Sequence, residues 1–326
     1  MKKNIAVVGC GHWGKNLVRN FSELGSLRSV SDSDNSLAKS YAEKYGVTCK
    51  SFSEILEDPE IKGVVLAVPA PLHSEMSVAV MKSGKHVYVE KPLAMNQEEA
   101  IQMIQTSKKN NVHLMVGHLL QYHPIFISLK DMVKSGEIGE IKYIYSNRLS
   151  FGKVRSEEDV IWSFAPHDIS MILSIMDEMP KHVMTQSATM LQNEIADSSI
   201  IHLDFESGQK AHITVSWYHP YKEQKLVVIG DSGMIVFDDT KLWENKLSLY
   251  RHETLLNQIP PMLNKAEAEF IEVVQSEPLR NECQHFIDIL DGKHKPLTDG
   301  AEGLNVLNVL TAATNSRIKN ERVKLR

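Results

Sequence analysis

The chain has few of the features that mark disulfide-rich, metal-binding, nucleic-acid-binding or membrane proteins. Its three cysteines, Cys10, Cys49 and Cys283, are far apart in 326 residues, which predicts neither a disulfide framework nor a zinc site. The 14 histidines show no metal-binding spacing, so no metal is expected. With 36 basic and 41 acidic residues and no run of five like charges, nucleic acid is not expected as a partner. No apolar run approaches the about 18 residues of a membrane span, and a cytoplasmic protein is expected.

The first part of the chain alternates short apolar runs with amphipathic helical patterns. Runs such as "NIAVVG", "LRSVSD", "GVVLAVP", "HVYVEKP" and "HLMVGH" are separated by stretches of helical periodicity. This alternation is typical of βαβ units and predicts a parallel, doubly wound sheet. The opening run is too short for a signal peptide and continues directly into glycines. We therefore expect a first, doubly wound α/β domain over residues 1–121.

From Tyr122 the pattern changes to longer strands of alternating polarity. "IIHLDFESGQKAHITVSW" predicts a hairpin that turns at Ser207 and Gly208. We expect an α+β domain over residues 122–326 with a large, mostly antiparallel open sheet. A helix that begins after Pro166 is expected to cover one face, and two C-terminal helices are expected to pack back on the body.

A glycine-rich loop follows the first predicted strand and opens the first helix. Gly9, Gly11 and Gly14 have G-x-G-x-x-G spacing, which lets backbone N–H groups approach a pyrophosphate. Asp32 ends the second strand, where a carboxylate accepts hydrogen bonds from a ribose and repels a 2′-phosphate. The glycine loop and Asp32 together predict that residues 1–121 form a dinucleotide-binding Rossmann domain and that it binds NAD rather than NADP. A plain glycine turn and a helix-capping or turn role for Asp32 are the alternatives.

The segment "YVEKPLA" places Lys91 at the carboxyl end of a predicted parallel strand, where open α/β sheets bind their ligands. Pro92 fixes the backbone beyond it. Beside a cationic nicotinamide ring, the Lys91 ammonium would give up its proton more readily and serve in acid–base chemistry. Glu90 either orients that ammonium or faces away from it. An ordinary surface lysine is the alternative.

Together with the glycine loop, the "P-x-x-x-H" segment at Pro69–His73 and the "E-K-P" segment at Glu90–Pro92 resemble the glucose-fructose oxidoreductase and inositol dehydrogenase family (Gfo/Idh/MocA). The resemblance extends over essentially the whole chain, including "GHLLQYHP", "SGEIGEIKYI" and "PLTDGAEGLNVLNVL". It implies a cis peptide before Pro92 and an active-site histidine at His167. Many members have an aspartate four residues before that histidine, whereas this chain has Ser163. The expected catalytic residues are therefore Lys91 and His167.

Two further sets of residues are predicted to bind ligands. The cofactor set comprises Gly9, Gly11, His12, Trp13, Gly14, Asp32, Pro69, His73, Glu90 and Lys91. The substrate set comprises Lys91, His118, Gln121, Tyr122, Arg148, Lys153, Arg155, His167 and Asp168, with His123 and Asn147 as further candidates. Trp13 is expected either to pack or to cover the pyrophosphate. His73 either touches the cofactor or starts a helix. Asp168 either caps a helix or contacts substrate.

The resemblance implies an NAD-dependent oxidoreductase that acts on a sugar ring hydroxyl. "DVIWSFAPHDISMIL" is similar to the branch that oxidises UDP-linked N-acetylamino sugars at carbon 3, whose ketone product feeds an aminotransferase in lipopolysaccharide or surface polysaccharide synthesis. Lys153 and Arg155 would then bind the diphosphate, although a solvated basic loop is equally consistent. A free-sugar or inositol dehydrogenase and a non-catalytic dinucleotide-binding regulator are the alternatives. A homodimer or homotetramer is expected through the open sheet.

Overall fold

The structure, a computed structural model, describes residues 3–255 and 259–325. The chain divides into two compact units. Unit 1 comprises residues 1–122 and 277–307, and unit 2 comprises residues 123–276 and 308–326. The predicted two-domain division at residue 121 differs from this one in its treatment of the C-terminal segment, because residues 277–307 group with the first unit.

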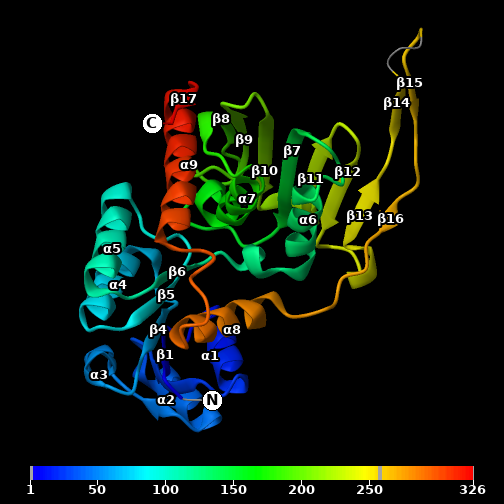
Figure 1. Cartoon of the computed structure of the whole chain (residues 1–326). Helices are drawn as coiled ribbons and strands as arrows, with labels where there is room; N and C mark the ends of the chain where they lie inside the picture. The colour runs from blue at the N-terminus through cyan, green and yellow to red at the C-terminus, as the bar shows by residue number, and fades with distance from the viewer. Residues whose placement is uncertain (1–2, 256–258, 326) are drawn as a thin grey trace. The chain divides into compact units, whose positions relative to one another are not determined.

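Unit 1 is built on a six-stranded parallel sheet of order β3-β2-β1-β4-β5-β6 (Figure 1). Its strands are β1 (Ile5–Val8), β2 (Leu27–Ser31), β3 (Thr48–Cys49), β4 (Gly63–Leu66), β5 (His86–Glu90) and β6 (Leu114–Gly117). Its helices are α1 (Gly14–Glu23), α2 (Asn35–Tyr45), α3 (Phe52–Glu57), α4 (His73–Lys82), α5 (Gln97–Asn110), α8 (Pro278–Leu290) and the first part of α9 (Gly300–Lys319), with short 3-10 turns η1 (Ala70–Leu72) and η2 (Leu119–Tyr122). The strand order reverses between β1 and β4, and the carboxyl edge at such a point is where doubly wound sheets bind ligands.

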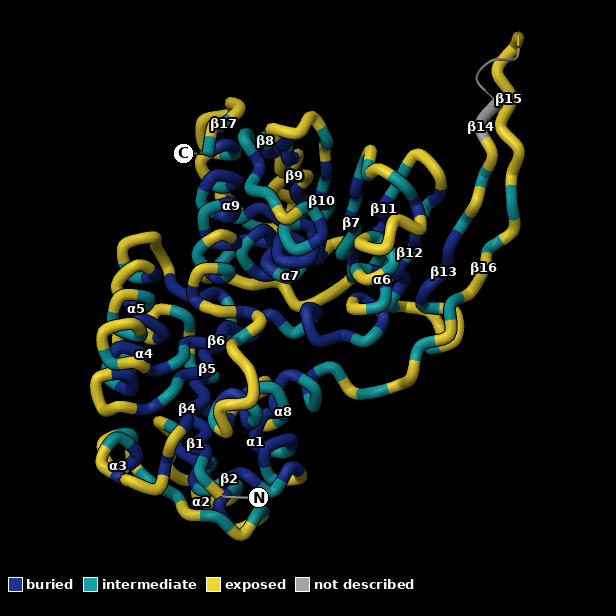
Figure 2. The backbone as a smooth tube through the Cα atoms, viewed as in Figure 1, coloured by how far each residue is buried: buried dark blue, intermediate teal, exposed yellow. Residues whose placement is uncertain are grey.

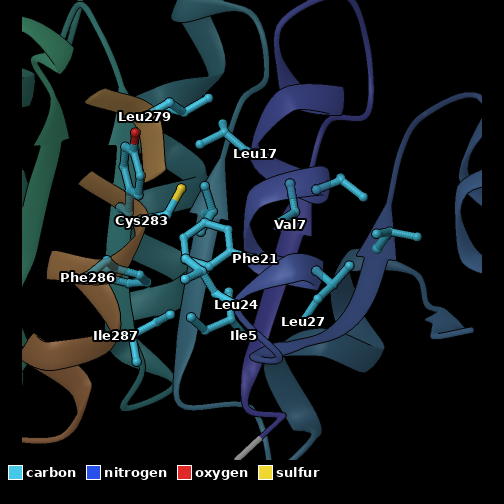
Figure 3. Packing of buried hydrophobic residues seen from close by; sticks show 14 of the residues in the cluster. Ile5, Val7, Leu17, Phe21, Leu24, Leu27, Leu279, Cys283, Phe286 and Ile287 are labelled. Carbon is cyan, nitrogen blue, oxygen red and sulfur yellow. The ribbon is translucent and has the colours of Figure 1, made fainter. Parts of the chain in front are cut away.

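One face of this sheet is covered by α1 and α8, which lie far apart in the sequence. Figure 3 shows Phe21 of α1 and Phe286 of α8 pointing toward the same cluster, and their ring centroids are 6.3 Å apart in an edge-to-face arrangement. Both side chains are fully buried. Aromatic pairs of this kind contribute about 0.5–1.5 kcal/mol beyond their area burial. The helix α8 is therefore an integral part of the nucleotide-binding unit.

Unit 2 is built on a nine-stranded sheet of order β16-β13-β12-β11-β7-β10-β9-β8-β17. Its strands are β7 (Ile141–Phe151), β8 (Pro180–Ala188), β9 (Ser198–Phe205), β10 (Lys210–Ser216), β11 (Tyr218–Gly230), β12 (Met234–Asp238), β13 (Leu247–Tyr250), β16 (Glu269–Phe270) and β17 (Val323–Lys324). Among the strands that the structure describes in this sheet, only β7 and β10 pair in parallel. The expected mostly antiparallel sheet is confirmed, and Gly208, with a φ of +95°, makes the predicted turn between β9 and β10.

The helices of unit 2 are α6 (Pro124–Lys134), α7 (Val160–Met176) and the second part of α9 (Gly300–Lys319), with a 3-10 turn η3 (Trp243–Asn245). The prediction that a helix begins after Pro166 is wrong. Asp159 caps α7 by accepting hydrogen bonds from the N–H groups of Ile161 and Trp162, so the helix begins at Val160 and runs through Pro166. His167 consequently lies inside α7 rather than at its start.

A two-stranded hairpin, β14 (Glu253–Leu255) and β15 (Met262–Asn264), projects from the sheet of unit 2 in Figure 1, and Figure 2 shows β15 as exposed. Leu263 of this hairpin is 75% exposed. The sequence patterns did not predict the hairpin, nor did they predict β3 and α3 in unit 1. All three elements are short, and short elements carry too few residues for a hydrophobic period to stand out.

Candidate active site

The glycine loop lies between β1 and α1, as predicted, and two of its glycines have no room for a side chain. A Cβ at Gly9 would lie 2.5 Å from the carbonyl oxygen of Ala67, and a Cβ at Gly14 would lie 1.9 Å from the carbonyl oxygen of Gly9. Gly9 also has a φ of +94°. At Gly11, in contrast, a Cβ would meet nothing within 4 Å. The loop is thus packed tightly against backbone atoms at Gly9 and Gly14 and leaves open space at Gly11, which the close approach of a pyrophosphate requires.

Asp32 is tied directly to this loop. Its Oδ2 accepts a hydrogen bond of 2.6 Å from the N–H of Cys10, and its Oδ1 accepts one of 2.9 Å from the N–H of Asp34. The helix-capping alternative for Asp32 is wrong, because Asp34 caps α2. The turn alternative is partly right, since the bond to Asp34 closes a local turn. Asp32 remains half-buried at the end of β2, and a carboxylate has further lone pairs with which to accept from a ribose.

Trp13 and Glu90 connect the loop to the end of β5. The indole N–H of Trp13 donates to Oε1 of Glu90 at 2.6 Å, while the ring is 39% exposed. Burial raises the pKa of Glu90, although the Trp13 N–H and the charge of Lys91 act in the opposite direction. Gly117 of β6 leaves space for this carboxylate, because a Cβ there would lie 2.9 Å from Oε2 of Glu90. Trp13 is therefore anchored by a polar bond and is not a simple packing residue.

Lys91 follows Glu90 at the carboxyl end of β5 and is half-buried. The peptide between Lys91 and Pro92 is cis, as the family resemblance implied. The segment places the lysine at the ligand-binding edge of the sheet. Pro69 and His12 are exposed near the same edge, in the segments that follow β4 and β1.

His73 is the first residue of α4 and is only 1% exposed. Its Nδ1 lies 2.7 Å from the carbonyl oxygen of Pro92, and its Nε2 lies 2.9 Å from that of Val68. Two carbonyl acceptors favour a charged ring, but burial outweighs them and lowers the pKa of His73. A neutral ring carries one N–H and so donates to only one of the two oxygens, of which that of Pro92 is the nearer. Of the two roles predicted for His73, the structure supports the helix-start role. The side chain links the β4–α4 connection to the Lys91–Pro92 turn.

The residues at the end of β6 are buried in unit 1. Nδ1 of His118 lies 2.6 Å from Oε2 of Glu302, and the hydroxyl of Tyr122 lies 3.1 Å from that of Thr298. His118, Gln121 and Tyr122 are each less than 5% exposed. Sequence reasoning missed Glu302 and Thr298, since nothing in their local spacing signals a partner more than 170 residues away. A substrate role for the three β6 residues stays a prediction.

In unit 2, α7 places Ser163 and His167 four residues apart on one helical face. Ser163 is buried and His167 is half-buried. The neighbouring Asp168 is 1% exposed and accepts hydrogen bonds from Nε of Arg148 at 2.6 Å and from the hydroxyl of Ser146 at 2.6 Å. The capping role considered for Asp168 is wrong, because Asp159 is the cap. Arg148 and Asp168 thus fix α7 to β7, and substrate contact by either remains a prediction.

The remaining substrate candidates lie in unit 2 as well. Lys153 and Arg155 are exposed in the segment between β7 and α7, and Nε of Arg155 lies 3.7 Å from Oε1 of Glu158. His123 caps α6 through its ring Nδ1. Asn147 donates to Oε1 of Glu223 at 2.6 Å. Lys153 and Arg155 are accessible to an anion, whereas His123 and Asn147 have evident structural partners.

The sheet order, the glycine loop and Asp32 are those of a dinucleotide-binding Rossmann domain. A model described as "Oxidoreductase family, NAD-binding Rossmann fold" matches residues 3–118, and the "GFO/IDH/MocA C-terminal domain" matches residues 126–236. The chain belongs to the GFO/IDH/MocA family of oxidoreductases. None of the helices in the described residues is long and apolar enough to cross a bilayer.

Three similar proteins illustrate the range of this family. The myo-inositol 2-dehydrogenase of Thermotoga maritima is 26% identical, and the alignment covers 98% of each chain. The UDP-N-acetylglucosamine 3-dehydrogenase of Acidithiobacillus ferrooxidans is 22% identical, over 92% of this chain and 93% of the relative. The solved structure of GenD2 from gentamicin A biosynthesis, in complex with NAD, has a TM-score of 0.82 at 20% identity and covers 100% of this chain and 97% of its own.

Proposed function

We propose that this oxidoreductase transfers hydride between NAD and a hydroxyl-bearing ring carbon of a sugar, and that its substrate is a UDP-linked N-acetylamino sugar oxidised at carbon 3. The observation that carries the proposal is the position of Lys91. It follows β5 at the ligand-binding edge of the sheet, next to Glu90, whose carboxylate is bonded to Trp13 of the glycine loop. A lysine held beside the cofactor loop is suited to handle a substrate proton.

An alcohol carbon can lose hydride only if its hydroxyl proton also leaves. When bound, the nicotinamide supplies the hydride acceptor. Lys91 is proposed to bind the reacting oxygen and share its proton, and His167 is proposed to act as general base, since imidazole titrates near neutral pH. Gly11, Asp32 and Trp13 are the residues proposed to hold the cofactor.

The substrate class rests on the basic segment after β7. Lys153 and Arg155 are exposed there, and an anionic diphosphate requires cationic partners. The similarity to a UDP-N-acetylglucosamine 3-dehydrogenase supports this choice. The similarity to a myo-inositol 2-dehydrogenase supports the alternative, oxidation of a free polyol or sugar.

A panel of substrates distinguishes a nucleotide-sugar dehydrogenase from a free-sugar or polyol dehydrogenase. The protein is mixed with NAD and one of four substrates, which are UDP-N-acetylglucosamine, its uronate, glucose and myo-inositol. A coupled aminotransferase removes the ketone product, and the rate of NADH formation is recorded. We expect the two nucleotide sugars to react at least about tenfold faster than the others, since loss of a charged contact costs more than 1 kcal/mol. Faster oxidation of myo-inositol would support the alternative. The variant Lys153→Ala/Arg155→Ala should raise KM for the nucleotide sugars alone.

The catalytic assignment is tested by Lys91→Ala and His167→Ala. Loss of a proton-transfer group lowers kcat about 10²–10⁴-fold. Lys82→Ala, which removes an exposed lysine at the end of α4, is the control and should leave kcat unchanged. A protein that turns over no member of the panel but binds NADH would instead fit the dinucleotide-binding regulator.

We also propose that the chain forms a homodimer or homotetramer through the open face of the nine-stranded sheet. That face carries a hollow of about 570 Å³, where apolar and aromatic side chains such as Tyr145, Val227 and Phe270 alternate with charged ones such as Lys225 and Asp238. Apolar side chains on an otherwise polar surface are typical of subunit interfaces. Sedimentation equilibrium would give the mass of a monomer if this proposal is wrong.

A further inference from the structure

A buried carboxyl group, Glu282, lies beside Glu90, the residue that binds Trp13 of the glycine loop, and has no role in the chemistry proposed above. Glu282 and Cys283 of α8 pack on the face of β5 that carries Tyr88 and Glu90. The rings of Tyr88 and Phe286 are 5.7 Å apart in an edge-to-face contact that fixes the two elements. Glu282 and Tyr88 are 0% exposed, and Glu90 is 9% exposed. Figure 3 shows Cys283 and Phe286 of the same helix turned toward the core of the unit.

The two carboxyl groups have different partners. Glu90 accepts from the Trp13 indole at 2.6 Å and is close enough to the charge of Lys91 for that charge to favour its ionised form. Within the described residues, neither oxygen of Glu282 makes a hydrogen bond of ordinary geometry, and no positively charged group is among those that influence its pKa. The Tyr88 hydroxyl is close to Glu282 but does not reach hydrogen-bonding geometry.

The surrounding groups oppose a second negative charge. Burial, followed by repulsion from Glu90, raises the pKa of Glu282 well above its ordinary value of 4.5. The other titratable groups around it are Tyr88, Tyr122 and Cys283, none of which supplies a positive charge. Lys91 and His118 act on Glu90. Two buried carboxylates that interact cannot both stay ionised, and the one without a donor takes the proton.

We propose that Glu282 is a neutral carboxylic acid in the folded protein and serves as a positioning residue for the cofactor loop. Because it is uncharged, Glu90 can remain the anion that holds Trp13. An ionised Glu282 would repel Glu90 and weaken the bond from Trp13 to β5. The inference concerns NAD binding by unit 1 and does not depend on the identity of the sugar.

The first test compares Glu282→Gln, which keeps the shape and the neutral charge, with the wild type in urea unfolding across pH. A carboxyl group whose pKa is higher in the folded than in the unfolded protein stabilises the fold at pH values below the unfolded pKa. This stabilisation is lost as pH rises toward the folded pKa. The folding equilibrium constant of the wild type, relative to Glu282→Gln, should thus fall about tenfold per pH unit above 4.5 until the folded pKa is reached. Parallel profiles between about pH 5 and about pH 8 would overturn the proposal.

The second test is infrared spectroscopy of the full chain. The wild type should show the carbonyl band of a buried protonated carboxylic acid at neutral pH, and Glu282→Gln should lack it. Glu277→Gln is the matched control on the same helix segment, because the pKa of Glu277 is lowered by Arg19 and its carboxyl is ionised. If the band persists in Glu282→Gln, the proposal is wrong.

The third test measures NADH binding by fluorescence. It involves no turnover, so its outcome does not depend on whether the proposed reaction is correct. Glu282→Ala, which leaves a cavity beside Glu90, and Glu90→Gln, which removes the anion, should each weaken NADH binding about fivefold or more. Glu282→Gln should restore binding to within about twofold of the wild type. If Gln binds NADH as poorly as Ala does, neutral charge is not what Glu282 provides and the proposal is overturned.

Discussion

The paired variants Gly14→Ala and Gly11→Ala separate the packing role of the glycine loop from its binding role. At Gly14 the new Cβ would lie 1.9 Å from the backbone oxygen of Gly9 and 3.3 Å from the Ala67 side chain. Backbone atoms cannot rotate away as a side chain does, so the start of α1 must shift. The helix propensity gained by replacing glycine with alanine is at most about 1 kcal/mol, and overpacking costs about 1–3 kcal/mol or more.

We therefore expect Gly14→Ala to destabilise the protein by about 2 kcal/mol, measured by urea unfolding, with a fall in Tm of several degrees. Gly11→Ala should leave stability within about 0.5 kcal/mol of the wild type, because its Cβ meets nothing within 4 Å. It should instead weaken NADH binding about tenfold or more, since the methyl group occupies the space through which a pyrophosphate approaches. The reasoning is refuted if Gly14→Ala unfolds like the wild type or if Gly11→Ala binds NADH normally.

Two further predictions concern His73 and Asp239. His73→Phe should lower the free energy of unfolding by about 1–3 kcal/mol, because the Pro92 carbonyl oxygen loses its hydrogen-bond donor. His73→Gln keeps a donor and should recover part of that loss. Equal Tm values for the two variants would contradict this reasoning. Burial raises the pKa of Asp239, but contact with His123 and Lys246 outweighs it and lowers the value from 3.8 to about 2. A carboxylate whose pKa is lower in the folded than in the unfolded protein stabilises the fold at pH values above the unfolded pKa, and this stabilisation is lost as pH falls through the folded pKa. Asp239 therefore contributes about 2 kcal/mol to stability near neutral pH, and this contribution disappears between about pH 4 and about pH 2. Asp239→Asn should therefore flatten the acid side of the stability profile, and an unchanged profile would show that the carboxylate is not the acid-sensitive group.

The C-terminal segment is tied to unit 1 by contacts between residues that lie far apart in the sequence. His118 meets Glu302 across 184 positions, and α8 joins the unit whose first strand begins at Ile5. No local pattern carries such information, because hydrophobic periodicity identifies which face of an element is buried and not which element covers it. The helical period of "NECQHFIDIL" predicted an amphipathic helix correctly, but only the fold shows that this helix buries a carboxyl group beside Glu90.

The amino-acid sequence by itself determined the parallel sheet, the glycine loop, the position of Asp32 and the place of Lys91 at the end of a strand. These features follow from residue type and short-range spacing, since a G-x-G-x-x-G loop and a strand end are local. The tertiary structure alone decided that Trp13 bonds to Glu90 across 77 positions, that His73 supports the Lys91–Pro92 turn, and that Arg148 and Asp168 form a buried ion pair. Those pairings depend on which surfaces the packed elements bring together, because a buried polar group takes the partner that geometry offers it.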